Sequence, residues 1–370
     1  MKLRWNFRCY PTKKQRQVLA QTFGCTRFVY NRFLTERTNA FKDGQRMNYN
    51  QSSAALTKLK QLPEYVWLNQ VSSVPVQQSL RHLQTAFKNF FNKQTRYPTF
   101  KKKSGNQSAE YTSSGFKFEI GNQRLLIAKM GRFKVKFSRH VSVMPTTVTI
   151  LQRPSGKYFV SFVVDVVPAP TPETGTNVGI DFGINRLATL STGERIANPK
   201  YLNKYQRKMA RIQKNLARKK KGSGRYIRCR KKLAIMHEKI ANSRKDVLNK
   251  LAWNLVNRFD TICVEDLNLR GMVKNHHLAR SLSDASIGAA IRTIETKAKM
   301  HGKEVVKVDR WFPSSKMCCV CGSVQESMPL SVRKWTCKCG AIHDRDECAA
   351  INILAVGQTV SGCGDDVSLS

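Results

Sequence analysis

The chain has 370 residues, and its 65 Lys and Arg against 24 Asp and Glu give a formal net charge of +41. An apolar fraction of 41% supplies a real core and argues against wholesale disorder, while no uninterrupted apolar run reaches the length of a membrane span. The basic N-terminus lacks the apolar stretch of a secretory signal, so none is expected.

The charge itself points to the class of partner. A chain this basic repels itself until polyanions neutralise it, so nucleic acid is the expected partner. An anionic membrane surface is the alternative, but no basic amphipathic anchor stands out. Five of the 11 cysteines fall within residues 318–339, which favours a metal site in a reducing compartment over a secreted disulfide framework.

The first 100 residues are predicted to be mainly helical. Residues 2–10 alternate loosely and predict a strand, and a helix is expected over 13–34, with Gly24 as a break. A second amphipathic helix is expected over 75–92, and its aromatic and leucine stripe is interpreted as ordinary core packing.

The middle of the chain changes character. Short alternating or apolar runs separated by glycines over 110–167 predict a β-rich module, a small barrel or sheet. The Pro- and Thr-rich stretch 168–176 is typical of a linker. A buried strand is then expected over 177–183, with a hairpin partner at 187–191.

Residues 201–257 are predicted to form two long helices joined at 221–224. The span 201–250 contains 18 Lys and Arg but only two acids, and its apolar stripe is thin, which indicates a surface for a phosphate backbone. In the rest of the chain, strands are expected at 261–264 and 304–308, and helices near 284–301 and from Asp344 through Leu354.

The cysteine cluster predicts a closed structural zinc site. Two pairs, each followed by glycine, form a four-thiolate pattern that suits tetrahedral Zn²⁺, and its members are Cys318, Cys321, Cys337 and Cys339. The second pair is one residue shorter than the common spacing, so Cys319 and His343 remain possible substitute ligands. Free buried cysteines are the alternative interpretation.

Acidic side chains stand at the ends of the predicted apolar strands. Asp181 ends or bends the first strand, Glu265 ends the second, and Asp344 and Asp346 flank Arg345 at the start of the last helix. These acids could meet at one sheet edge and share two Mg²⁺ ions, which prefer oxygen ligands. Individually, each could instead be a turn residue or a helix N-cap.

Other catalytic classes lack their motifs. The tripeptide Asp181-Phe182-Gly183 matches one kinase motif, but no glycine-rich loop or kinase catalytic loop accompanies it. The chain also has no P-loop of nucleotide hydrolases and no HExxH of zinc proteases.

At these residues the chain resembles the TnpB (OrfB) family encoded by bacterial insertion sequences, which is related to the type V CRISPR effector nucleases. The resemblance covers nearly the whole chain in ordered landmarks, and these are YPTKKQRQVL…FGCTRFVYNRFL, YPTFKKK, GIDFGINRLATLS, VEDLNLRGM, WFPSSKMCCVCG and WTCKCGAIHDRDECAAINIL. It implies an RNA-guided DNA endonuclease, encoded by a transposable element, that cuts target DNA beside a short adjacent motif.

The resemblance also implies an architecture. The expected fold is α+β and multidomain, with an RNase H-like (RuvC) nuclease domain that contains an inserted zinc ribbon, and a β-barrel-like module that contains an inserted N-terminal helical domain. The expected bounds are 1–10 and 101–170 for the β-barrel-like module, 11–100 for the helical (helix-turn-helix-like) recognition domain, 175–310 and 341–356 for the nuclease domain with its basic hairpin 201–257, 311–340 for the zinc ribbon, and 357–370 for a disordered tail.

Carried over residue by residue, the resemblance assigns the catalytic acids. Asp181 and Glu265 match the first two, and Asp346 matches the third, with Asp344 as the alternative. The three acids would hold two Mg²⁺ ions, one for the attacking water and one for the departing 3′ oxygen. Arg345 would orient a carboxylate or the scissile phosphate, or form only a surface ion pair. Cys348 departs from the usual Asn, and Glu347 adds another acid.

The partners follow from the same resemblance. They are a guide RNA from the transposon end and double-stranded target DNA, bound by a monomer on one RNA and without a membrane, in the cytoplasm of a bacterium or archaeon near the nucleoid. The heteroduplex channel is expected to be lined by Arg207, Lys208, Lys219, Lys220 and Lys221. Two alternatives stay open, a catalytically inactive RNA-guided DNA-binding repressor and a transposase that acts on element ends.

Overall fold

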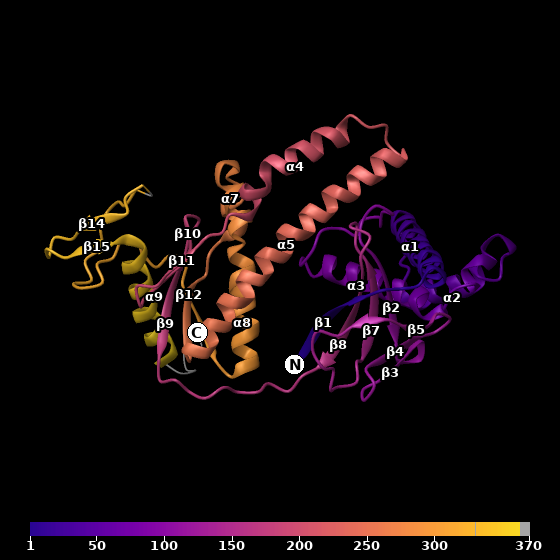
Figure 1. Cartoon of the computed structure of the whole chain (residues 1–370), viewed down its shortest axis with the longest axis horizontal. Coiled ribbons are helices and arrows are strands. Elements are labelled where there is room, and N and C mark those ends of the chain that lie inside the picture. Colours follow the sequence, from indigo (N-terminus) through magenta and orange to yellow (C-terminus); the bar gives the residue numbers. More distant parts are fainter. Residues whose placement is uncertain (330, 363–370) are drawn as a thin grey trace. The chain divides into compact units, whose positions relative to one another are not determined.

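The computed structural model describes residues 1–329 and 331–362, which form two compact units, Met1–Val166 and the chain from Val167 onward. Figure 1 shows the elements of each unit. In the described part of the chain, none of the helices combines the length and the apolar character that crossing a membrane requires.

The first unit combines a helical part with a β-rich part. Its helices are α1 (Lys13–Lys42), α2 (Tyr49–Leu59), a 3₁₀ segment at Pro63–Asn69 and α3 (Ser73–Phe91). Its longer sheet has the order β2-β7-β8-β1-β6, formed by Gln107–Thr112, Thr147–Gln152, Tyr158–Asp165, Lys2–Cys9 and Val135–Lys136. Its smaller sheet has the order β3-β4-β5, formed by Phe116–Glu119, Arg124–Ile127 and Gly131–Phe133.

Helix α1 begins at a capping box and runs without a break. The Gln15 amide donates to Thr12 Oγ1 at 3.3 Å, and the Thr12 amide donates to Gln15 Oε1 at 3.0 Å. The predicted break at Gly24 is wrong, because α1 continues through it to Lys42. Buried neighbours on either side, such as Phe23 and Cys25, anchor the helix there and outweigh the weak helix propensity of one glycine.

The second unit is built on a mixed five-stranded sheet. The order is β11-β10-β9-β12-β13, formed by Arg195–Ala197, Arg186–Leu190, Asn177–Phe182, Thr261–Glu265 and Glu304–Val308. The last three strands are mutually parallel, whereas β10 is antiparallel to both of its neighbours. The strands predicted in this part of the sequence are therefore confirmed.

Helices cover both faces of this sheet, as Figure 1 shows. One face packs against α5 (Gly224–Arg258) and α8 (Ile287–His301), and the other packs against α9 (Arg345–Gly362). Side chains alternate along a strand, so Ile262 and Val264 join the core under α5 and α8, while Cys263 packs under α9.

Three further helices and a small hairpin complete the unit. The helices are α4 (Tyr201–Ala217), α6 (Leu269–Met272) and α7 (His276–Ala285), and the hairpin pairs β14 (Lys334–Thr336) with β15 (Ile342–Asp344). The predicted tail from residue 357 is wrong up to Gly362, because α9 continues to that residue. Residues 363–370 lie outside the described residues.

Helices α4 and α5 form the basic hairpin that the charge run predicted. Their apolar contact is small and centres on Met209, Met236 and Ile240. The buried Asp284 carboxylate fixes the base of the hairpin, because it accepts the Leu202 amide at 2.9 Å and pairs with Arg244 at 2.6 Å. Because the apolar contact is so small, most charged side chains of the hairpin lie outside the hydrophobic core.

Candidate functional site

Asp181 and Glu265 lie at the same edge and on the same face of the second sheet. Ile180 on β9 is paired with Val264 on the neighbouring parallel strand β12, and each acid follows one of these residues directly. Ile180 and Val264 point into the core under α5 and α8. Alternation therefore turns both carboxylates toward the opposite face, which α9 covers.

Two glycines let α9 pack closely on this face. A Cβ added at Gly179 on β9 would overlap the Ala350 carbonyl oxygen and lie 2.6 Å from the Leu354 amide nitrogen. A Cβ added at Gly357 on α9 would overlap the Cys263 side chain on β12. The close contact places the first turn of α9, and with it Asp346, near the two strand ends.

Asp181 is electrostatically coupled to the other two acids. Burial, followed by the neighbouring charges of Glu265 and Asp346, raises the pKa of Asp181 to about 7. Burial also raises the pKa of Glu265, an effect that the hydrogen bond from the Ser314 hydroxyl opposes. Gathered carboxylates of this kind are unfavourable alone and suit a hard cation such as Mg²⁺.

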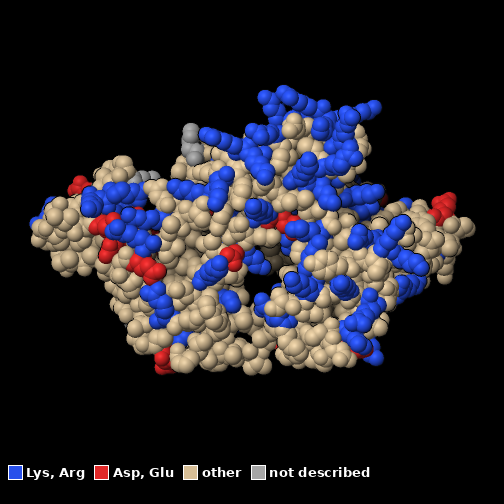
Figure 2. Space-filling view, in the orientation of Figure 1, with Lys and Arg blue, Asp and Glu red and all other residues tan. Residues whose placement is uncertain are grey.

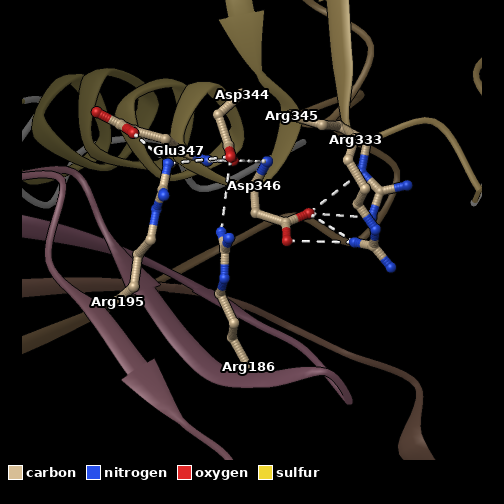
Figure 3. A network of polar contacts seen from close by, with 7 residues as sticks. All are labelled: Arg186, Arg195, Arg333, Asp344, Arg345, Asp346 and Glu347. Carbon is tan, nitrogen blue, oxygen red and sulfur yellow. Dashed lines mark hydrogen bonds and ion pairs between the residues drawn. The ribbon is translucent and has the colours of Figure 1, made fainter.

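Figure 3 shows that Asp344 and Asp346 have different polar partners. Asp344 Oδ1 accepts the backbone amides of Asp346 at 3.2 Å and Glu347 at 3.3 Å, so it caps the start of α9. Its Oδ2 accepts from Arg195 at 3.0 Å, which also contacts Glu347.

Asp346 is held by two arginines. Arg333 Nη1 lies 3.2 Å from both carboxylate oxygens, and Arg345 donates to Oδ1 from Nε at 3.2 Å and from Nη2 at 2.9 Å. Arg345 is only 9% exposed, so its contact with Asp346 is not a surface ion pair. Of the roles considered from the sequence, the orientation of a carboxylate matches this geometry.

Sequence reasoning missed two of these contacts. Ser314 lies 49 residues from Glu265 along the chain, and Arg333 lies 13 residues before Asp346. Ser314 belongs to the landmark WFPSSKMCCVCG, whereas Arg333 lies outside the landmarks, and both sit in segments of irregular structure. The landmark could have drawn attention to Ser314, but no feature of the sequence connects either residue with its carboxylate partner.

The four predicted zinc ligands come together. The Sγ atoms of Cys318, Cys321, Cys337 and Cys339 all lie within 4.8 Å of one another. The separations are 3.8 Å for Cys318–Cys339 and 3.6 Å for Cys321–Cys337. Zn–S bonds of about 2.3 Å in a tetrahedron place sulfurs about 3.8 Å apart, so the set fits zinc.

The short second pair still forms a turn around the site. Gly322 and Gly340 adopt φ of 73° and 86°, and their amides donate to the Cys318 and Cys337 carbonyls at 2.9 Å each. Glycine makes this left-handed backbone accessible in both turns. Cys319 and His343 lie outside this four-sulfur set.

The basic hairpin forms a cleft of about 830 Å³. Three of the five basic residues predicted there, Arg207, Lys208 and Lys219, line it together with Arg225 and Arg228. Figure 2 shows Lys and Arg side chains gathered over this hairpin. Of the two remaining predicted residues, Lys221 lines a smaller neighbouring hollow, and Lys220 is exposed in the connecting loop.

Three family models match the chain. The model described as "Probable transposase" matches residues 161–276, that described as "Helix-turn-helix domain" matches residues 1–46, and that described as "Cas12f1-like, TNB domain" matches residues 288–353. The third match spans α8, β13, the cysteine cluster and the first turns of α9.

Curated relatives match almost end to end. A Streptomyces pristinaespiralis protein named "Putative RNA-guided DNA endonuclease" is 46% identical, over 99% of this chain and 92% of its own length. The Escherichia coli (strain K12) protein named "Putative RNA-guided DNA endonuclease InsQ" is 31% identical, over 98% of this chain and 94% of its own length.

A solved structure shares the fold. The chain described in "Cryo-EM structure of the Cas12f1-sgRNA-target DNA complex" superimposes with a TM-score of 0.60 at 13% identity, over 95% of this chain and 98% of that one. The predicted α+β multidomain architecture is therefore confirmed at the level of the fold.

Proposed function

Because the chain belongs to the TnpB (OrfB) family, we propose that it is an RNA-guided DNA endonuclease whose catalytic acids are Asp181, Glu265 and Asp346. The observation that supports this most directly is the convergence of the three carboxylates in a chain with a net charge of +41. Partly buried acids that repel one another are unfavourable, and such groups are typical of functional sites, here in a protein that otherwise attracts polyanions.

Asp181, Glu265 and Asp346 would hold two Mg²⁺ ions. Bound Mg²⁺ would neutralise charge on the phosphodiester and make a water more acidic. The protein's own contribution is placement: Ser314 fixes the Glu265 carboxylate, and Arg333 with Arg345 fixes that of Asp346. The glycine-dependent packing of α9 keeps the third acid against the other two.

The nucleic-acid partners would be a guide RNA from the transposon end and double-stranded target DNA. The basic cleft of α4 and α5 would bind the heteroduplex through its backbone, with Arg207, Lys208, Lys219, Lys220 and Lys221 as the contacts. Base pairing by the guide would specify the sequence, and the protein would read shape and a short flanking motif.

We place this chemistry in a domain organisation that follows the sequence landmarks. Residues 175–310 and 341–356 would form the RuvC-like nuclease domain, and 311–340 the zinc ribbon held by the four cysteines. Residues 1–10 and 101–170 would form a β-barrel-like module around the helical recognition domain 11–100. In this scheme one chain acts on one RNA.

Plasmid cleavage tests the proposed function. The protein is expressed together with the DNA that flanks its gene and purified with the RNA it retains. A plasmid that matches the 3′ end of this RNA behind a randomised flank is then offered with Mg²⁺. We expect cutting that depends on the retained RNA and on Mg²⁺, and sequencing of the cut products identifies the flank.

RNase treatment of the complex before the assay is the control. Cutting or joining of element ends that survives RNase would replace the proposal with a transposase. Retention of RNA and target without cutting at any Mg²⁺ concentration would replace it with a guided repressor.

A matched pair of substitutions tests the third acid. Asp346→Asn should lower the cleavage rate by about a thousandfold or more, since it removes a charged ligand of the proposed site. Asp344→Asn should stay within about tenfold of wild type, because Asn also caps helices and the two ion pairs that are lost, with Arg186 and Arg195, are partly exposed. Single-turnover cleavage rates of both variants are compared with that of wild type. If Asp344→Asn were the slower variant, Asp344 would be the metal ligand.

A further inference from the structure

A second set of metal-ligand side chains lies beside the four-cysteine site. Cys319 Sγ, Cys348 Sγ and a ring nitrogen of His343 all lie within 4.8 Å of one another. They come from three segments: Cys319 from the first cysteine turn, His343 from β15 and Cys348 from the first turn of α9. The fold therefore brings side chains from three separate segments into one small cluster.

The surroundings favour a metal over three unrelated side chains. His343 is 6% exposed and Cys348 is 3% exposed, so two of the ligands are already removed from water. Both ring nitrogens of His343 face sulfur, with Nε2 3.1 Å from Cys318 Sγ and Nδ1 3.6 Å from Cys319 Sγ. Thiols are weak hydrogen-bonding partners for an imidazole, whereas thiolates and imidazole together are typical zinc ligands.

Neighbouring groups hold the set in place. Trp335 packs on the His343 ring with centroids 4.8 Å apart. Asn352 donates to the Ser314 and Met317 carbonyls at 2.8 Å each, and its Nδ2 lies 3.8 Å from Cys348 Sγ. These contacts join α9 to the loop that precedes Cys318, so the ligand positions are supported from outside the set.

We propose that Cys319, His343 and Cys348 bind a second Zn²⁺ ion, next to the ion of the four-cysteine site. Three protein ligands leave one position of a tetrahedron. Cys318 Sγ, which belongs to the first set and contacts His343, is placed to fill that position as a bridging thiolate. Seven side chains then serve two ions with four ligands each.

This pair of ions would link the cysteine turns to α9. Cys348 lies two residues after Asp346 on the same helix turn, so the second ion would fasten the part of α9 that carries the proposed third acid. The zinc inference rests on the ligand geometry alone and stands whether or not the protein cuts DNA.

Zinc content measured on the full chain tests the proposal. Protein purified under reducing conditions is passed over a chelating resin, and zinc per chain is determined by mass spectrometry of the metal. We expect two equivalents in wild type and one in both Cys348→Ala and Cys319→Ala. The control Cys229→Ser changes a buried cysteine of α5 outside both sets and should keep two. Cys321→Ser should lose the ion of the four-cysteine site.

Cobalt substitution supplies an independent readout. Co²⁺ bound to thiolates gives a charge-transfer absorption that grows with the number of sulfur ligands, so Cys348→Ala should lose part of this band. Equal zinc content and equal Co²⁺ spectra in wild type and Cys348→Ala would overturn the second site. A disulfide between Cys319 and Cys348 in the freshly purified wild type, with one zinc per chain, would also overturn it.

Discussion

Asp181→Asn is expected to abolish DNA cleavage while RNA retention and target binding stay close to wild type. The substitution keeps the size of the side chain but removes the charge of an acid that shares a site with Glu265 and Asp346. Loss of about 4 kcal/mol of transition-state stabilisation corresponds to roughly a thousandfold lower rate. The plasmid assay and a filter-binding titration measure the two properties on the same preparation.

The same variant should change the pH dependence of stability in the absence of metal. The pKa of Asp181 rises from 3.8 in the unfolded chain to about 7 in the folded protein, so the folded state binds more protons in this range. Stability is therefore fully present below the lower value and falls as the pH rises through the upper one. Asp181→Asn should remove this decline, and added Mg²⁺ should reduce it in wild type.

Thermal unfolding across the pH range, with and without Mg²⁺, shows the difference. Two results would contradict the assignment of Asp181. One is cleavage by Asp181→Asn at the wild-type rate. The other is a metal-free pH profile that is the same in both proteins, because burial and the neighbouring acids would then not raise the pKa of Asp181.

Gly179→Ala should unfold the second unit or displace α9 from the sheet. The new Cβ meets the Ala350 carbonyl oxygen and the Leu354 amide nitrogen, which are backbone atoms of a packed helix and cannot rotate away. We expect a loss of at least about 3 kcal/mol in the free energy of unfolding, the upper end for overpacked cores. Cleavage should fall with it, because the Asp346 position depends on α9.

Gly24→Ala is the matched control. Gly24 lies inside α1, and a Cβ there meets no heavy atom within 4 Å. This variant should be neutral or more stable by up to about 1 kcal/mol, since alanine favours helix over glycine. Denaturant unfolding of both variants separates a packing effect from a general intolerance of alanine. A Gly179→Ala protein as stable as wild type would mean that α9 does not need the close approach.

Local patterns in the sequence were enough to predict most of the elements. The alternating and apolar runs predicted β9, β12 and β13 close to their observed bounds, and the charge run predicted the α4–α5 hairpin. These patterns involve only residues that are close together in the sequence, so they can be recognised without a structure. They failed at Gly24, where buried neighbours hold α1 together across the glycine. They also failed after residue 356, where α9 continues to Gly362.

The four-cysteine set was predictable for a related reason. Its two pairs each lie within one turn, so spacing favoured these four sulfurs, and the structure brings them together. The cluster of Cys319 and His343 with Cys348 was not predictable, because it depends on where the first turn of α9 places Cys348. The sequence offered these two residues only as substitutes in the first set.

By itself the sequence determined the polyanion partner class, the family resemblance and the residue types available for chemistry. Tertiary structure decided how those residues are used. Asp344 and Asp346 are chemically alike and two positions apart, yet one caps a helix and the other contributes to the raised pKa of Asp181. Asp344 caps its own helix through local amides, whereas Asp346 acts on Asp181 because α9 packs on a glycine in β9, a contact between residues far apart in the chain.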